Sequence, residues 1–154
     1  MNVVGAPIKG LCFDKDGTLF DFAATWEAWA AALLIRAAKG DQALAIRVGA
    51  AIGFDLENRT FSNDSIVIAG TPGEVTDVLA PYFPDLSRPE LLDMLNEEAS
   101  LAPQEPAVPL VPLLEAFRAR GLALGVATND SEGPARAHLG SAGVTELFDF
   151  IAGY

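Results

Sequence analysis

Residues 8–19 read IKGLCFDKDGTL, and this segment is the most informative part of the chain. A short, mostly apolar run from Ile8 to Phe13 ends abruptly in a polar turn at residues 14–17. Such a change predicts a β-strand with a functional loop at its carboxyl end. Gly17 allows the chain to leave the strand in a backbone conformation that other residues avoid.

Two carboxylates lie at this predicted strand end. Asp14 and Asp16 are two positions apart, so the alternation of a strand would direct both side chains into the crevice at the carboxyl edge of a sheet. Paired carboxylates suit a hard cation such as Mg²⁺. They also suit a nucleophile beside a general acid, because like charges separate their pKa values. The alternative is a solvated Asp-Gly turn, but the flanking strand and helical pattern favour the functional interpretation.

The rest of the chain predicts a helical insertion followed by more of the same sheet. Helical patterns cover about 22–38 and 41–51, and capping boxes open two further helices at Thr71 and Ser87. Residues 66–68 fit a short strand or a buried loop. Residues 101–112 carry four prolines and predict a connector. Helices at about 113–120 and 132–142 then alternate with strands at 122–127 and 148–151, the former a continuous apolar run typical of a buried parallel strand.

This order predicts an α/β fold with a Rossmann-like parallel sheet and an inserted all-helical segment. We expect the sheet domain to comprise residues 1–19 and 105–154, and the helical segment residues 20–104. The second apolar strand ends in the polar turn Thr128-Asn129-Asp130.

Composition narrows the range of partners. The formal net charge is −11, which disfavours binding to DNA, RNA or anionic membranes. A phosphate site would have to be made locally by a cation and backbone N–H groups. The single cysteine, Cys12, is interpreted as a small core residue. Residues 1–10 lack the pattern of a secretory leader, so we expect a cytoplasmic protein.

Two motifs resemble those of the haloacid dehalogenase-like (HAD) hydrolases. Residues 13–19, FDKDGTL, resemble the first motif of that superfamily, DxDGT, and Ala127-Thr128-Asn129 resembles the second. The span between them resembles the helical cap of the phosphoglycolate phosphatase-like branch. The resemblance covers nearly the whole chain and implies a Mg²⁺-dependent phosphatase that hydrolyses small phosphorylated metabolites.

The same resemblance implies roles for individual residues. Asp14 would attack phosphorus and form an aspartyl-phosphate, and Asp16 would protonate the leaving alcohol and then activate water. Mg²⁺ would be held by the Asp14 carboxylate and the Asp16 backbone carbonyl. The phosphate-binding groups would be the Thr128 hydroxyl and the backbone N–H groups of Asn129, Lys15 and Gly17.

Other functions remain open at this point. A phosphomutase of the same superfamily would share the nucleophile and cap, and a catalytically inactive fragment could bind phosphate or a protein partner. The dehalogenase branch is disfavoured, because carbon–halogen cleavage needs no protonated leaving group and hence no Asp16. That branch also resembles DxY rather than DxDGT.

The third and fourth motifs of the superfamily, a lysine or arginine and one or two metal-binding acids, have no clear counterpart. No lysine follows Lys39, and Arg136 and His138 are interpreted as solvated helix residues. We therefore expect a chain truncated before these motifs, impaired as an enzyme, whose first strand is an exposed edge open to self-association.

Five further side chains receive structural interpretations. Trp26 and Trp29 are three apart on the first predicted helix and should pack inside the insertion. Arg47 and Arg59 are interpreted as solvent-exposed rather than as ligands of a substrate carboxylate. The Lys15 side chain should point away from the crevice, because strand alternation places it opposite Asp14 and Asp16.

Overall fold

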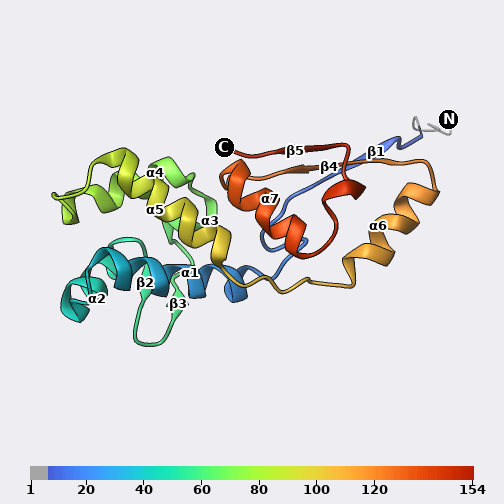
Figure 1. Cartoon of the computed structure of the whole chain (residues 1–154). Helices are drawn as coiled ribbons and strands as arrows, with labels where there is room; N and C mark the ends of the chain where they lie inside the picture. Colours follow the sequence, from blue (N-terminus) through green and yellow to red (C-terminus); the bar gives the residue numbers. More distant parts are fainter. Residues whose placement is uncertain (1–6) are drawn as a thin grey trace, which may run out of the picture.

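The computed structural model describes residues 7–154, so the first six residues of the predicted sheet domain lie outside it. A three-stranded parallel sheet forms one end of the molecule (Figure 1). Its strands are β1 (Gly10–Phe13), β4 (Ala123–Ala127) and β5 (Phe150–Ala152), in the order β1-β4-β5. The α/β class and parallel sheet predicted from the sequence are confirmed.

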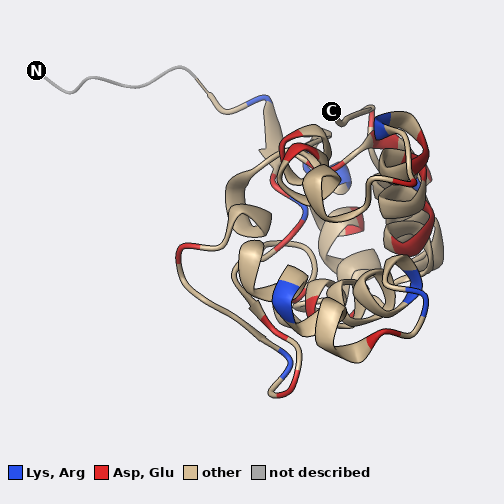
Figure 2. Cartoon of the chain, turned by 90° about the vertical axis from the view of Figure 1, so that its left-hand side faces the viewer, with Lys and Arg blue, Asp and Glu red and all other residues tan. Residues whose placement is uncertain are grey.

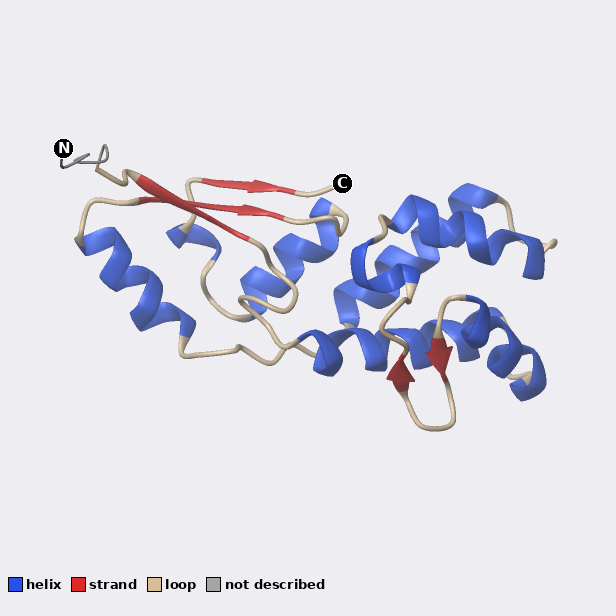
Figure 3. Ribbon diagram, turned by 180° about the vertical axis from the view of Figure 1, so that it is seen from behind, coloured by secondary structure: helices blue, strands red, loops and turns tan. Residues whose placement is uncertain are grey.

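Two helices cover one face of this sheet. They are α6 (Leu110–Ala119) and α7 (Glu132–Ser141), and both lie on the same side in Figures 1 and 3. Apolar side chains between the helices and strands form one of two hydrophobic clusters, centred on Leu114, Leu124, Val126 and Leu139. Among the described residues β1 pairs only with β4, so it is an edge strand, as expected.

The opposite face of the sheet carries no helix within the described part of the chain. Cys12, Gly125 and Phe150 are paired neighbours across the three strands and therefore share this face. Cys12 is exposed, so the interpretation of this residue as core is wrong. The physical reason is the alternation of β1, which directs Leu11 and Phe13 toward the helices and Cys12 away from them.

The insertion, defined here as residues 22–101, packs around its own hydrophobic cluster. It contains α1 (Phe22–Ala37), α2 (Gln42–Ala51), α3 (Ile66–Ala69), α4 (Pro72–Leu79) and α5 (Arg88–Leu101), with a small hairpin of β2 (Phe54–Asp55) and β3 (Thr60–Phe61). Trp26 and Trp29 are both buried in this cluster, as predicted. Two short 3₁₀ turns, Ala80–Tyr82 and Thr145–Leu147, complete the elements.

Local sequence explains where several helices begin. Both predicted capping boxes form: the Thr71 and Ser87 side chains accept backbone N–H groups, and Glu74 and Glu90 bond back to the two cap residues. Asp41 caps α2 by accepting the Leu44 N–H at 3.0 Å. Each of these bonds satisfies N–H groups that the first helical turn leaves unpaired.

Two segments differ from the sequence prediction. Residues 66–68 belong to the short helix α3, whose first turn is capped by the Ser65 hydroxyl, rather than to a strand or loop. Helix α6 begins at Leu110, inside the predicted proline-rich connector. Pro112 is tolerated there because the first turn of a helix needs no N–H from that position.

The structure shows neither a cluster of basic residues nor a membrane-spanning helix within the described residues. Acidic residues outnumber Lys and Arg by 21 to 10, and Figure 2 shows the basic ones scattered over separate elements. Of the helices within residues 7–154, none has the length and apolar character needed to cross a membrane.

Candidate active site

The loop that follows β1 folds tightly on itself. The Asp14 carboxylate is at an exposed position and accepts the Lys15 N–H at 2.8 Å. Gly17 adopts a φ of 76° and donates its N–H to the Phe20 carbonyl at 2.8 Å. This left-handed backbone conformation strains any residue with a side chain, which explains the glycine.

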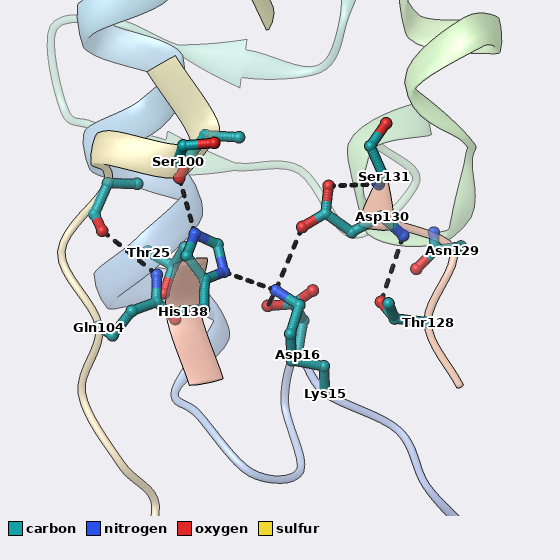
Figure 4. A network of polar contacts seen from close by, with 12 residues as sticks. Lys15, Asp16, Thr25, Ser100, Gln104, Thr128, Asn129, Asp130, Ser131 and His138 are labelled. Carbon is teal, nitrogen blue, oxygen red and sulfur yellow. Dashed lines mark hydrogen bonds and ion pairs between the residues drawn. The ribbon is translucent and has the colours of Figure 1, made fainter. Parts of the chain in front are cut away.

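Lys15 is fully buried at the base of this loop. Its Nζ donates to Asp16 Oδ1 at 2.8 Å and to His138 Nδ1 at 2.8 Å (Figure 4). It also forms an ion pair with Asp130 Oδ2 at 3.2 Å, without the alignment of a hydrogen bond. The predicted direction of the Lys15 side chain, away from the crevice, is therefore wrong. Strand β1 ends at Phe13, so the alternation of a strand no longer applies two residues later.

His138 connects this cluster to the insertion. Its Nε2 lies 2.7 Å from the carbonyl oxygen of Ala99 in α5. Because a carbonyl only accepts, Nε2 carries the hydrogen and Nδ1 accepts from Lys15. His138 is only 1% exposed, so the interpretation as a solvated residue is wrong. The spacing of buried Pro134 and His138, four apart on α7, is the signal that could have placed it on the inner face.

Burial shifts the pKa values of two groups in the cluster. Burial raises the pKa of Asp130 to about 6, against the opposing charge of Lys15. Burial also lowers the pKa of His138 to about 4, and the positive charge of Lys15 acts in the same direction. At neutral pH His138 is therefore neutral and Asp130 is mostly ionised.

Residues of the second motif lie beside this cluster. The Thr128 hydroxyl accepts the Asp130 N–H at 3.2 Å, and Asn129 Nδ2 donates to the Gly70 carbonyl of the insertion at 2.8 Å. Asp130 contacts Lys15 and thereby links the two motif loops. Asp130 belongs to the polar turn predicted after β4, but the sequence pattern gave no indication of this contact. Arg136, by contrast, forms an exposed ion pair with Glu132, as predicted for a surface residue.

A cavity lies between the insertion and the sheet domain. It reaches three residues of the two motif loops and eleven of the insertion: Asp16, Asn129 and Asp130, with Phe22, Trp26, Trp29, Val67, Ile68, Gly70, Pro72, Val75, Leu95, Asn96 and Ala99. Of the predicted site residues, Asp16 and Asn129 line it, while Asp14, Lys15, Gly17 and Thr128 do not.

The donor set at the loop fits a magnesium ion only in part. Within residues 7–154 no group of three or more His, Cys, Asp and Glu side chains is arranged to hold a metal. The Asp14 carboxylate and the Asp16 carbonyl nevertheless offer hard oxygen ligands. Mg²⁺ commonly takes one or two carboxylates and completes its shell with water and substrate phosphate, so the residues present are compatible with it.

Solved structures with the same fold include several hydrolases. A Clostridium difficile protein assigned as a phosphatase matches 97% of the chain with 20% identity and a TM-score of 0.58. A predicted phosphoglycolate phosphatase from Haemophilus somnus matches 95% with 17% identity and a TM-score of 0.53. A HAD-type hydrolase from Bacillus subtilis, bound to magnesium, matches 96% with 18% identity and a TM-score of 0.56.

The matched regions are 62%, 62% and 64% of those three chains, so this chain spans less than two thirds of their length. No curated protein sequence matches the chain. The model of one protein family, the haloacid dehalogenase-like hydrolases, matches residues 8–154. With this match over nearly its entire length, and with both motif loops meeting at one edge of a parallel sheet, the chain belongs to the haloacid dehalogenase-like hydrolase family.

Proposed function

We propose that the protein is a Mg²⁺-dependent phosphomonoester hydrolase that forms an aspartyl-phosphate at Asp14. The observation that carries this proposal is the position of a second carboxylate, Asp16, on the wall of the cavity. An oxygen leaving group needs a proton, whereas a halide leaving group does not. A general acid at this position therefore supports phosphate ester hydrolysis over dehalogenation.

Asp16 is held in place for that role. Its side chain is only 9% exposed and accepts a hydrogen bond from the buried Lys15 ammonium. Lys15 is itself anchored to His138. In its protonated form, an Asp16 side chain fixed in this way at the cavity edge would donate its proton to the leaving oxygen, and the resulting carboxylate would then accept a proton from the attacking water.

Asp14 is the proposed nucleophile because it is exposed at the mouth of the loop. A carboxylate that approaches a phosphate dianion is repelled by roughly 4 kcal/mol per pair of unit charges, at a separation of about 4 Å and an effective dielectric constant near 20. Bound magnesium would supply compensating positive charge, held by the Asp14 carboxylate and the Asp16 backbone carbonyl. These two groups are the metal ligands that we assign within the described residues.

Hydrogen-bond donors for the phosphate would come mainly from the second motif. The Thr128 hydroxyl accepts the Asp130 N–H, which leaves its own hydrogen free to donate to a phosphate oxygen. The Asn129 N–H would assist. The N–H groups of Lys15 and Gly17 already donate to Asp14 and to Phe20, so they would have to exchange partners to bind phosphate.

The proposal is tested by phosphate release from 4-nitrophenyl phosphate, with the natural full-length protein and Mg²⁺. We expect hydrolysis that stops when EDTA is added and falls at least about a thousandfold in Asp14→Asn. Asp85→Asn, an exposed acid far from the loop in sequence, is the matched control and should retain activity. Equal activity in Asp14→Asn and wild type, or chloride release from 2-chloropropionate in place of phosphate release, would overturn the assignment.

A further inference from the structure

The side chains that line the cavity are mostly apolar. Three aromatic side chains, Phe22, Trp26 and Trp29, line it together with Val67, Ile68, Val75 and Leu95. Trp26 and Trp29 meet edge to face, with ring centroids 5.2 Å apart. Among residues 7–154, no Lys, Arg or His lines the cavity. The surface offered to a ligand beyond Asp16 is thus predominantly apolar.

Lys15 lies close to the cavity but already has partners, and Arg47 and Arg59 do not line it. Lys15 Nζ lies 5.5 Å from the centre of the Trp26 ring, but it already binds Asp16, His138 and Asp130. Arg47 and Arg59 are exposed and do not line the cavity, as the sequence predicted. A ligand carboxylate would lose its hydration beside two acidic side chains without gaining a cationic partner, which is strongly unfavourable.

One polar group of the cavity wall lacks a partner. Trp26 is 8% exposed, and its buried Nε1 forms no hydrogen bond within the described residues. Trp29 Nε1, by contrast, donates to the Leu95 carbonyl at 3.0 Å. Buried N–H groups are almost always bonded, so the Trp26 N–H is open to an acceptor supplied by a ligand or by an ordered water.

We propose that the substrate is the phosphate monoester of an uncharged, apolar alcohol, aromatic or branched aliphatic, that carries one hydrogen-bond acceptor for Trp26 Nε1. This inference rests on the proposed phosphatase activity and specifies its substrate class. The phosphoryl group lies at Asp14, the leaving oxygen at Asp16, and the alcohol extends between the insertion and the sheet domain. Carboxylated esters such as phosphoglycolate are then poor substrates.

Binding of the product alcohols tests this inference without turnover. The chain contains two tryptophans, and both line the cavity, so intrinsic fluorescence reports directly on its occupancy. The probes are benzyl alcohols with methoxy, ethyl or carboxylate groups at the 4-position, together with glycolate. We expect the methoxy probe to bind most tightly, and the carboxylate probe and glycolate to bind at least ~10-fold more weakly.

Three variants separate hydrogen bonding from packing. Trp26→Phe removes the N–H and keeps an aromatic ring, so the preference for methoxy over ethyl should fall to about one. Trp29→Phe is the matched control and should retain that preference, because its N–H is already bonded to Leu95. Ile68→Arg adds a cation at a partly exposed position of the wall and should increase binding of the carboxylate probe by about tenfold.

The outcomes distinguish this inference from the proposed function. Equal or tighter binding of glycolate or of the carboxylate probe overturns the inference, as does faster hydrolysis of phosphoglycolate than of 4-methoxybenzyl phosphate; in the latter case the phosphatase activity itself stands. Selective binding of the neutral alcohols without any phosphate release supports the apolar alcohol site and overturns the phosphatase assignment. An unchanged methoxy preference in Trp26→Phe overturns the role of its N–H group.

Discussion

Lys15 Nζ and His138 Nδ1 lie 2.8 Å apart, although 123 positions separate the two residues in the chain. Through this bond the loop after β1 is tied to α7, and the second ring nitrogen of His138 continues the connection to Ala99 in α5. Asp16, the proposed general acid, is bonded to Lys15. Lys15 is linked to the insertion by two successive hydrogen bonds, first to His138 and then from His138 to Ala99.

Replacement of Lys15 by methionine should strongly destabilise the fold. The substitution leaves Asp16 and Asp130 as neighbouring acids without their shared cation, and breaking a buried ion pair from one side typically costs about 3–5 kcal/mol. Urea denaturation followed by circular dichroism measures the loss. Lys9→Met, at an exposed position, is the control and should change the free energy of unfolding by less than about 0.5 kcal/mol.

A second substitution should restore part of that loss. In the Lys15→Met background, Asp130→Asn removes one of the two unpaired acids, so the double variant should be more stable than Lys15→Met alone by about 1–2 kcal/mol. In the wild-type background, the same Asp130→Asn change removes the charged partner of Lys15. Strict additivity of the two single effects would show that the Lys15–Asp130 ion pair does not contribute to stability.

The neutral state of His138 should make stability depend on pH. Its pKa is lowered to about 4 in the folded protein from 6.5, so the unfolded chain binds the extra proton first. The stabilising contribution is present above pH 6.5 and is lost as the pH falls toward 4, with a total of roughly 3 kcal/mol. His138→Gln retains a donor and an acceptor but does not titrate. As the pH falls from 6.5 to 4, the unfolding free energy of the wild type should therefore decrease relative to that of this variant.

Asp130 should contribute a slope of opposite sign. Its folded pKa of about 6 lies above its ordinary value of 3.8, so its stabilising contribution is present below pH 3.8 and is lost as the pH rises through 6. Asp130→Asn should remove this slope while the slope from His138 persists. If Asp130→Asn and wild type show identical pH dependence between 3.8 and 6, the burial of this carboxyl does not raise its pKa.

Magnesium should stabilise the protein through Asp14. A ligand that binds only the folded state at a hundred times its Kd contributes about 2.7 kcal/mol, which is measurable as an increase in Tm on titration with MgCl₂. Asp14→Asn should abolish the increase, and Asp85→Asn should retain it. An equal increase in Tm for wild type and Asp14→Asn would place the bound magnesium elsewhere.

Gly125 should be required by the ring of Phe150. A Cβ at this position would overlap the ring, so the ring would have to swing away. Gly125→Ala should therefore destabilise the sheet by about 1–2 kcal/mol, and Phe150→Ala should suppress this effect. Gly133→Ala in α7 is the control: a Cβ there meets open space, and stability should increase by about 0.5–1 kcal/mol.

Most of the fold could be predicted from local sequence patterns. The capping boxes at Thr71 and Ser87, the apolar run of β4 and the helical period of α1 are each decided within a few neighbouring residues, so they could be read before any tertiary contact was known. Cys12 could not, because its exposure depends on which face of the sheet the helices cover. Helix α3 was also missed, since four residues are too few for a period to emerge.

By itself the sequence determined the α/β class, the family motif around Asp14 and Asp16, and the buried position of the two tryptophans. Only the tertiary structure decided that Lys15 lies inward, that His138 and Asp130 join it, and that none of residues 7–154 brings a free cation to the cavity wall. The physical reason is that alternation and helical period describe a residue relative to its own element. Contacts between elements depend instead on where a strand ends and on which helix faces another, which no local pattern records.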